Sequence, residues 1–257
     1  MKKSFISFLK KKALKVYVVD VVFFSLLLWF LVYARNRIFS YLVVLQQFAP
    51  KLTGIGSDLA SDNPLSIAQV DALINVLDPI VREAKFFIFF VIPIMVFLLW
   101  VFFQGLGWNL MRHDSFKRVL DIRLYPSFAV ASIPFFAVIV FLLNDFLNIS
   151  ESFDPTRYVI TWILLFVIFY FTVISYQVVN QPRFFRRLVY ISIRKAWIFF
   201  PVFLLMLVFF LIACVFLFNA YISVLSLAVP SFLMIAMSLF LILLFSSSKC
   251  LLSYLSE

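Results

Sequence analysis

Six blocks of nearly continuous apolar sequence make up most of this 257-residue chain. Each block is about as long as the roughly 20 residues that an apolar helix needs to cross some 30 Å of hydrocarbon. The blocks are residues 16–34, 86–104, 126–147, 158–179, 197–218 and 221–245. We therefore predict an all-α fold, a polytopic transmembrane bundle of six helices, because a helix satisfies its backbone polar groups internally.

The overall composition excludes a soluble domain. Hydrophobic residues reach 65% and charged residues only 13%, whereas a soluble domain carries about a quarter charged residues. The first block, 16–34, is longer than the apolar core of a secretory signal, and no small-residue cleavage site follows it. We expect it to be retained as the first span.

The basic residues predict an orientation, since Lys and Arg concentrate on the cytoplasmic side of short loops. Most of the 22 Lys and Arg fall on alternate connections between the spans. We therefore expect a protein of the plasma membrane with both termini in the cytoplasm. We accordingly expect a cationic interfacial segment (1–15), an outer helical hairpin (35–85), a basic inner loop (105–125), an outer loop (148–157), a second basic interfacial segment (180–196) and a cytoplasmic tail (246–257). Residues 219–221 read as a tight turn between the last two spans.

A weak repeat suggests that the spans form three helical hairpins. An aromatic residue with paired basic residues precedes each outward span, as in Phe116-Lys117-Arg118 and Phe185-Arg186-Arg187. Asp78-Pro79 and Asp154-Pro155 are typical helix starts, because the carboxylate caps free N–H groups and proline suits the first turn. Duplication explains this pattern, but so does the basic inner flank of any six-span protein.

The inner segments have the composition of interfacial helices, in which aromatic side chains enter the headgroup layer and cations meet anionic lipid headgroups. A nucleic-acid role is disfavoured because no soluble domain is present to shape a groove. The residues that we expect to contact headgroups on the cytoplasmic face are Lys10, Lys11, Lys12, Lys117, Arg118, Arg183, Arg186, Arg187, Arg194 and Lys195.

The outer segment 35–85 predicts a helical hairpin. After Asn63-Pro64 an apolar stripe runs along one helical face, with Asp71, Asn75, Asp78 and Arg82 on the other. Residues 51–62, which include two glycines, read as the turn. The stripe needs a cover, and the hairpin itself, the lipid surface and a partner protein are all candidates.

Polar residues within spans are the natural candidates for function, because a charge in the bilayer is costly. Asp20 lies one turn inside the first span, where we expect it to pair with Lys15 or a basic inner loop, and Asn144 and Asp145 lie at the outer end of the third. These three residues have either a structural role or a role in a proton or ion relay.

The sequence contains no recognisable catalytic, cofactor-binding or metal-binding motif. The only histidine is His113, too few for a zinc hydrolase, and no G-x-S-x-G elbow occurs. Cys250, next to Lys249 beyond the last span, is a buried thiol or a palmitoylation site. The four glycines avoid the centres of the spans, which argues against a carrier built from broken helices.

The stretch Ser115 to Pro126, S-F-K-R-V-L-D-I-R-L-Y-P, resembles the inner loop of Yip-type membrane proteins and their prokaryotic relatives. This resemblance covers about a twentieth of the chain and implies a small multi-span protein without catalytic motifs. The outer hairpin departs from the eukaryotic Yip pattern. The six spans, cytoplasmic ends and cationic N-terminus are also similar to the permeases of ABC exporters, in which an inner loop docks an ATPase.

Three functions remain as hypotheses. The first is a non-enzymatic scaffold or accessory subunit of a membrane complex, with its outer hairpin (35–85) available to a protein partner. The second is the permease subunit of an ABC-type exporter. The third is a lipid-modifying enzyme that uses Asp20, His113 or Asp145.

Overall fold

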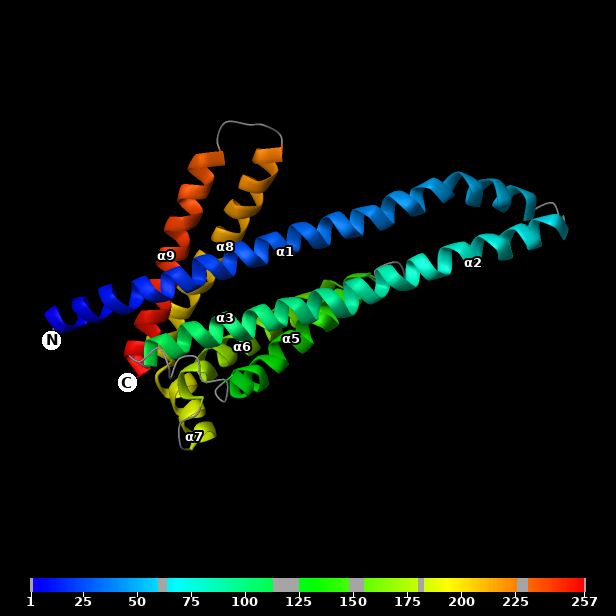
Figure 1. The fold of residues 1–257 in the computed structure, drawn as a ribbon. Coiled ribbons are helices and arrows are strands. Elements are labelled where there is room, and N and C mark those ends of the chain that lie inside the picture. The colour runs from blue at the N-terminus through cyan, green and yellow to red at the C-terminus, as the bar shows by residue number, and fades with distance from the viewer. Residues whose placement is uncertain are drawn as a thin grey trace. The chain divides into compact units, whose positions relative to one another are not determined.

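The protein is helical throughout the residues that the computed structural model describes, which are 2–59, 64–112, 125–147, 155–179, 183–225 and 231–256. No strand occurs among them. The elements, drawn in Figure 1, are α1 (Lys2–Leu59), α2 (Pro64–Phe86), the π-helical turn η1 (Phe87–Val91), α3 (Ile92–Arg112), α5 (Tyr125–Leu147), α6 (Pro155–Val178), α7 (Phe184–Val189), the π-helical turn η3 (Tyr190–Arg194), α8 (Ala196–Leu225) and α9 (Ser231–Ser256).

The six membrane-length segments predicted from the sequence are confirmed. Six helical segments are long and apolar enough to span a bilayer: Lys12–Phe48, Asp71–Arg112, Tyr125–Leu142, Val159–Val178, Ala196–Leu217 and Ile235–Leu255. The first two are much longer than a crossing requires. The chain is therefore built as a multi-pass membrane protein whose first two spans continue into further helix.

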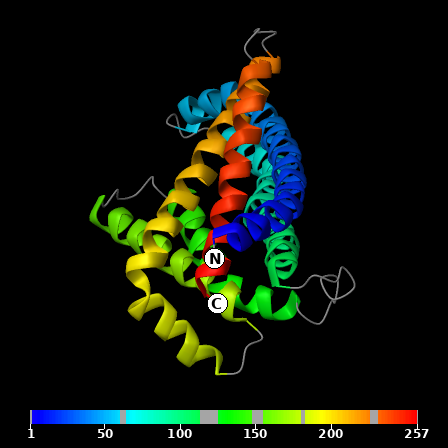
Figure 2. The ribbon, with the colours of Figure 1, turned by 90° about the vertical axis from the view of Figure 1, so that its left-hand side faces the viewer.

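The chain forms two compact units. The bundle unit consists of Met1–Leu28 and Phe97–Glu257, and the hairpin unit consists of Trp29–Val96. Within the bundle unit α5 packs along α6, and α8 packs along α9, as Figure 2 shows for the latter pair. These are the pairings expected of helical hairpins.

Aromatic side chains fill the centre of the bundle unit. Trp100 of α3 has ring neighbours on four other helices: its ring centroid lies 5.9 Å from those of Phe23 and Phe169, 6.0 Å from Phe135 and 6.2 Å from Phe210. Such edge and tilted contacts are the favoured aromatic geometries. A separate set of contacts joins Phe24, Phe210 and Phe245, so the rings connect α9 to the same cluster.

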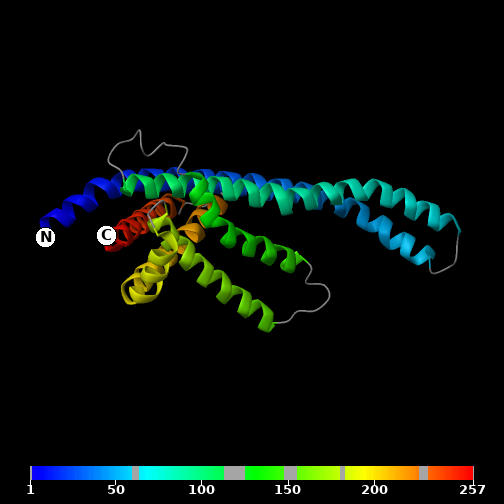
Figure 3. The same cartoon turned by 90° about the horizontal axis from the view of Figure 1, so that it is seen from below.

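The hairpin unit pairs α1 with α2, η1 and the first turn of α3 in antiparallel fashion (Figure 3). Its core contains Ala34, Tyr41 and Phe87, with Ile80 and Ala84 of the predicted stripe packed against it. Asp71, Asn75, Asp78 and Arg82 are exposed, as the periodicity predicts. α1 thus covers the end of the stripe nearest η1, whereas Ile74, farther along the stripe, is 55% exposed.

Two expectations for this hairpin were wrong. The turn does not begin at Lys51, because α1 continues through both glycines to Leu59, each at a cost of only about 1 kcal/mol relative to alanine. Asp78-Pro79 does not start a helix, since Pro79 lies inside α2, which begins at Pro64. Asp78 instead forms an ion pair with Arg82 at 2.7 Å. By contrast, α6 does begin at Pro155, as predicted.

The end of the chain also differs from expectation. Residues 219–221 are helical within α8, so the predicted tight turn does not lie there; the Asn219 side-chain amide donates to the Val215 carbonyl of the same helix at 2.9 Å. α9 begins at Ser231, later than the predicted start of the last span at residue 221. The predicted tail 246–257 is largely part of α9, and Lys249 within it is buried.

Candidate functional site

A buried ion pair joins the first and last spans of the bundle unit. Lys249 Nζ on α9 lies 2.5 Å from Asp20 Oδ1 on α1, and the two side chains are 2% and 0% exposed. Ser246 Oγ donates to the other carboxylate oxygen, Asp20 Oδ2, at 2.6 Å. The expected partners of Asp20, Lys15 or a basic inner loop, are therefore wrong.

Helical spacing explains why both donors meet one carboxylate. Ser246 and Lys249 are three residues apart and so share a face of α9. The same face carries Phe245, whose ring centroid lies 4.4 Å from Lys249 Nζ, a distance that permits cation–π attraction. On the opposite side lies Gly107 of α3, where an added methyl group would sit 3.9 Å from the ammonium. The ammonium is thereby enclosed by α1, α3 and α9.

Three further cations bond to backbone carbonyls at helix C-terminal ends in the bundle unit. Lys12 donates to the carbonyl of Met111 at 2.7 Å, and Lys195 donates to that of Leu255 at 3.3 Å. Arg112 donates to the carbonyls of Val179, at 2.9 Å, and of Tyr176. The last carbonyls of a helix lack intrahelical partners and carry the negative end of its dipole, so each cation stabilises the end that it contacts.

A second buried polar cluster crosses the bundle. Trp100 Nε1 on α3 donates to the Tyr176 hydroxyl on α6 at 2.7 Å, and that hydroxyl also bonds to Ser132 Oγ on α5. Ser132 bonds in addition to the Phe128 carbonyl at 2.8 Å. All three side chains are buried, and the cluster fixes the relative rotation of three helices.

α3 also carries buried amides. Gln104 and Asn109 are almost fully buried, and the Gln104 amide nitrogen and both polar atoms of the Asn109 side chain have no hydrogen-bond partner within the described part of the chain. Within the same ranges, no three His, Cys, Asp or Glu side chains gather as a metal site would require.

The predicted headgroup contacts divide into several groups. Arg183, Arg186, Arg187 and Arg194 are exposed on or beside α7 and η3, and Arg194 lies over the Tyr190 ring at 5.8 Å. Lys12 and Lys195 are half-buried and bond to the carbonyls named above. The side chains of Lys10 and Lys11, and residues Lys117 and Arg118 altogether, lie outside the described residues.

The remaining candidates fall in equally different places. Asn144 and Asp145 belong to the last turn of α5, with side chains outside the described set, and His113 lies outside it altogether. Cys250 is fully buried, which confirms the structural interpretation of this thiol. Sequence reasoning missed Lys249 as the partner of Asp20. The block bounds concealed the pairing, since Asp20 lies about one turn inside the block 16–34 and Lys249 about one turn beyond the block 221–245.

The arrangement as a whole ties helices together: a closed ion pair between first and last spans, a tyrosine-centred cluster and cations at helix ends. No protein family matches the chain, no curated protein is significantly similar to it, and no solved structure matches its fold. The resemblance to Yip-type proteins therefore rests on residues 115–126 alone.

Proposed function

We propose that this multi-pass membrane protein is a non-enzymatic scaffold or accessory subunit of a complex in the cell membrane, with both termini in the cytoplasm. The observation that carries the proposal is the aromatic centre of the bundle unit, where rings from six helices interlock around Trp100. Close-packed interiors transmit force and resist rearrangement. A rigid bundle of this kind suits the task of holding partners in place.

The ion pair supports the same proposal. Relay carboxylates in membrane proteins face a water-filled cavity or a pathway, whereas Asp20 is fully buried and has both carboxylate oxygens engaged by Lys249 and Ser246. A carboxylate held in this way serves to join α1 to α9. The same bonds argue against Asp20 as the acid or base of a lipid-modifying enzyme.

The hairpin unit offers the surface for a protein partner. Phe39, Leu42 and Val43 are exposed on α1, at the i, i+3, i+4 spacing of one helical face. This face is distinct from the one that carries Ala34 and Tyr41 in the core of the hairpin unit. An amphipathic helix of a partner, laid along this face, would cover the exposed apolar surface.

Purification of the full chain tests the proposal directly. An affinity-tagged chain, extracted from its native membrane in mild detergent, is expected to bring down one partner in a fixed ratio. Replacement of Phe39 and Leu42 by serine should release that partner, while the same change at Ile133 and Leu164, exposed on α5 and α6, should not. A monodisperse monomer that transports a solute on its own would overturn the proposal, and a copurifying ATPase would replace it with the exporter permease.

Thiol accessibility separates a scaffold from a permease by a second route. In a background with Cys214→Ala and Cys250→Ala, a single Phe169→Cys thiol at the aromatic centre should resist a membrane-impermeant thiol reagent added to either side. The exposed control, Arg183→Cys, should react. Rapid labelling of Phe169→Cys would indicate a water-filled path through the bundle.

A further inference from the structure

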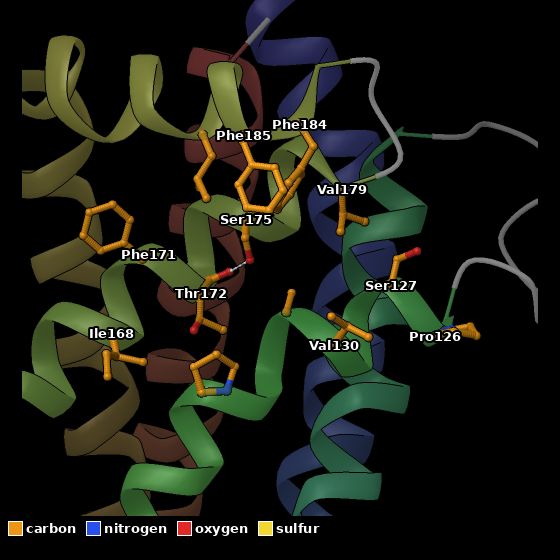
Figure 4. Close-up of a pocket in the computed structure, with 13 residues that line it drawn as sticks. Pro126, Ser127, Val130, Ile168, Phe171, Thr172, Ser175, Val179, Phe184 and Phe185 are labelled. Atoms are coloured by element: carbon orange, nitrogen blue, oxygen red, sulfur yellow. Dashed lines mark hydrogen bonds between the residues drawn. The ribbon is translucent and has the colours of Figure 1, made fainter.

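An apolar groove lies between α5 and α6 of the bundle unit, closed at one end by α7 (Figure 4). Its volume is about 740 Å³, within the range of small-molecule sites. α5 contributes Pro126, Val130, Ala131 and Pro134, α6 contributes Ile168, Phe171, Thr172 and Ser175, and α7 contributes Phe184, Phe185 and Leu188. Ser175 donates to the Thr172 carbonyl at 2.7 Å, so this hydroxyl adds little polarity to the wall.

The length of the groove matches one leaflet of a bilayer. Along α5 it extends from Pro126 to Pro134, about 12 Å at 1.5 Å per residue, and on the other side from Ile168 of α6 to Val179 just past its end, about 17 Å. Half of a hydrocarbon layer of roughly 30 Å is about 15 Å. The groove also lies at the start of α5 and the end of α6, which the distribution of Lys and Arg places at the cytoplasmic leaflet.

α7 presents opposite chemistry on its two sides. Phe184, Phe185 and Leu188 line the apolar groove, whereas Arg183, Arg186 and Arg187 line, with Tyr190, a separate hollow of about 540 Å³. The three arginines are exposed. Guanidinium groups bind phosphate in bidentate fashion, and each cation at a membrane surface adds about 1 kcal/mol of attraction to anionic lipid.

We propose that the groove and the α7 arginines form one site for an anionic phospholipid of the cytoplasmic leaflet. An acyl chain occupies the groove between α5 and α6, and the phosphate lies across α7 from it, in the hollow lined by Arg183, Arg186 and Arg187. A phospholipid joins a negative head to an apolar tail about one leaflet long, and these are the two features that this pair of surfaces complements. The site is independent of any protein partner and so stands apart from the scaffold function.

Lipid binding to the purified full chain tests the site. In native mass spectrometry or detergent thermal shift, phosphatidylglycerol should bind at least tenfold more tightly than phosphatidylcholine with the same acyl chains. The double variant Arg186→Gln, Arg187→Gln should lose this preference. The matched control, Arg35→Gln with Arg82→Gln, removes two exposed arginines of the hairpin unit and should retain it.

The groove has its own test. Ala131→Leu fills the groove and should weaken the binding of both lipids severalfold, whereas Ala137→Leu, exposed farther along the same helix, should not. Circular dichroism of each variant verifies the fold. Equal binding of the two lipids by the wild-type chain, or equal effects of the two leucine variants, would overturn the proposal. So would displacement of the lipid by soluble glycerol phosphate, since the headgroup alone would then be the ligand.

Discussion

Removal of Asp20 is the most informative perturbation, because it leaves Lys249 buried without its counter-charge. Among the described residues, Lys249 Nζ would retain the face of the Phe245 ring, 4.4 Å away, but no counter-charge. Breaking a buried ion pair by deleting one partner costs about 3–5 kcal/mol. We therefore expect Asp20→Leu to destabilise the contact of α1 with α9 by that amount.

The double variant Asp20→Leu, Lys249→Met should behave differently. It replaces both charges with apolar side chains of similar volume, a change that is often neutral or stabilising in buried sites. Ser246 would not be left unsatisfied, because its single hydroxyl hydrogen would then be donated to the Ile242 carbonyl, 2.9 Å away. We expect the double variant to regain the stability of the wild-type chain, and Lys249→Met alone to resemble Asp20→Leu.

Cys250 supplies the assay. It adjoins Lys249, is fully buried, and becomes the only thiol in a Cys214→Ala background. When opening is fast, the labelling rate follows the open population. A loss of 3–5 kcal/mol should accelerate maleimide labelling in detergent by roughly 150- to 5,000-fold, since about 1.36 kcal/mol corresponds to tenfold. The double variant should label within a few-fold of the parent rate.

Two results would refute this reasoning. If Asp20→Leu labels no faster than the double variant, the pair does not hold the two helices together. If the double variant keeps Cys250 protected but loses its copurifying partner, the charges serve function and not only structure. Asp20→Asn provides a further control, since it keeps the shape of the side chain while removing the charge.

Three smaller effects follow from the bundle unit. Tyr176→Phe removes the acceptor of Trp100 Nε1 and should cost about 1–3 kcal/mol in thermal unfolding followed by circular dichroism, whereas the exposed Tyr190→Phe should change little. Arg112→Met leaves the carbonyls of Tyr176 and Val179 without their donor and should cost a similar amount, against about 0.5 kcal/mol or less for the exposed Arg35→Met. Arg183 has a left-handed backbone with φ of 60°, so Arg183→Gly should raise the melting temperature relative to Arg183→Ala; an equal midpoint would contradict this.

Hydropathy predicted the spans, and helix-start chemistry predicted the N-terminus of α6 correctly. Pro155 begins that helix, where a missing N–H costs nothing, and Pro64 begins α2 in the same way. The same reasoning failed at Pro79, because a proline can also occupy an exposed helix interior where water solvates the carbonyl left without a donor. A dipeptide motif alone does not distinguish the two cases.

The candidate site was less predictable than the fold because its bonds join distant parts of the chain. Asp20 and Lys249 are 229 residues apart, and the local sequence around Asp20 offers Lys15 as a nearer partner. Only the tertiary pairing of α1 with α9 decides between them. The aromatic composition was visible, but the position of Trp100 at the centre of the ring cluster depends on how all the helices pack.

The basic residues show why a count of charges overestimates the contact with lipid. The formal net charge of +10 and the crowding of Lys and Arg at one side suggest a uniformly cationic surface. Yet Lys12, Arg112, Lys195 and Lys249 direct their charges to backbone carbonyls or to a buried carboxylate. These four side chains are buried or half-buried, whereas those of Arg186 and Arg187 on α7 are exposed. Because both kinds of cation enter the count from which the orientation is predicted, that count cannot identify a lipid site; burial must separate them.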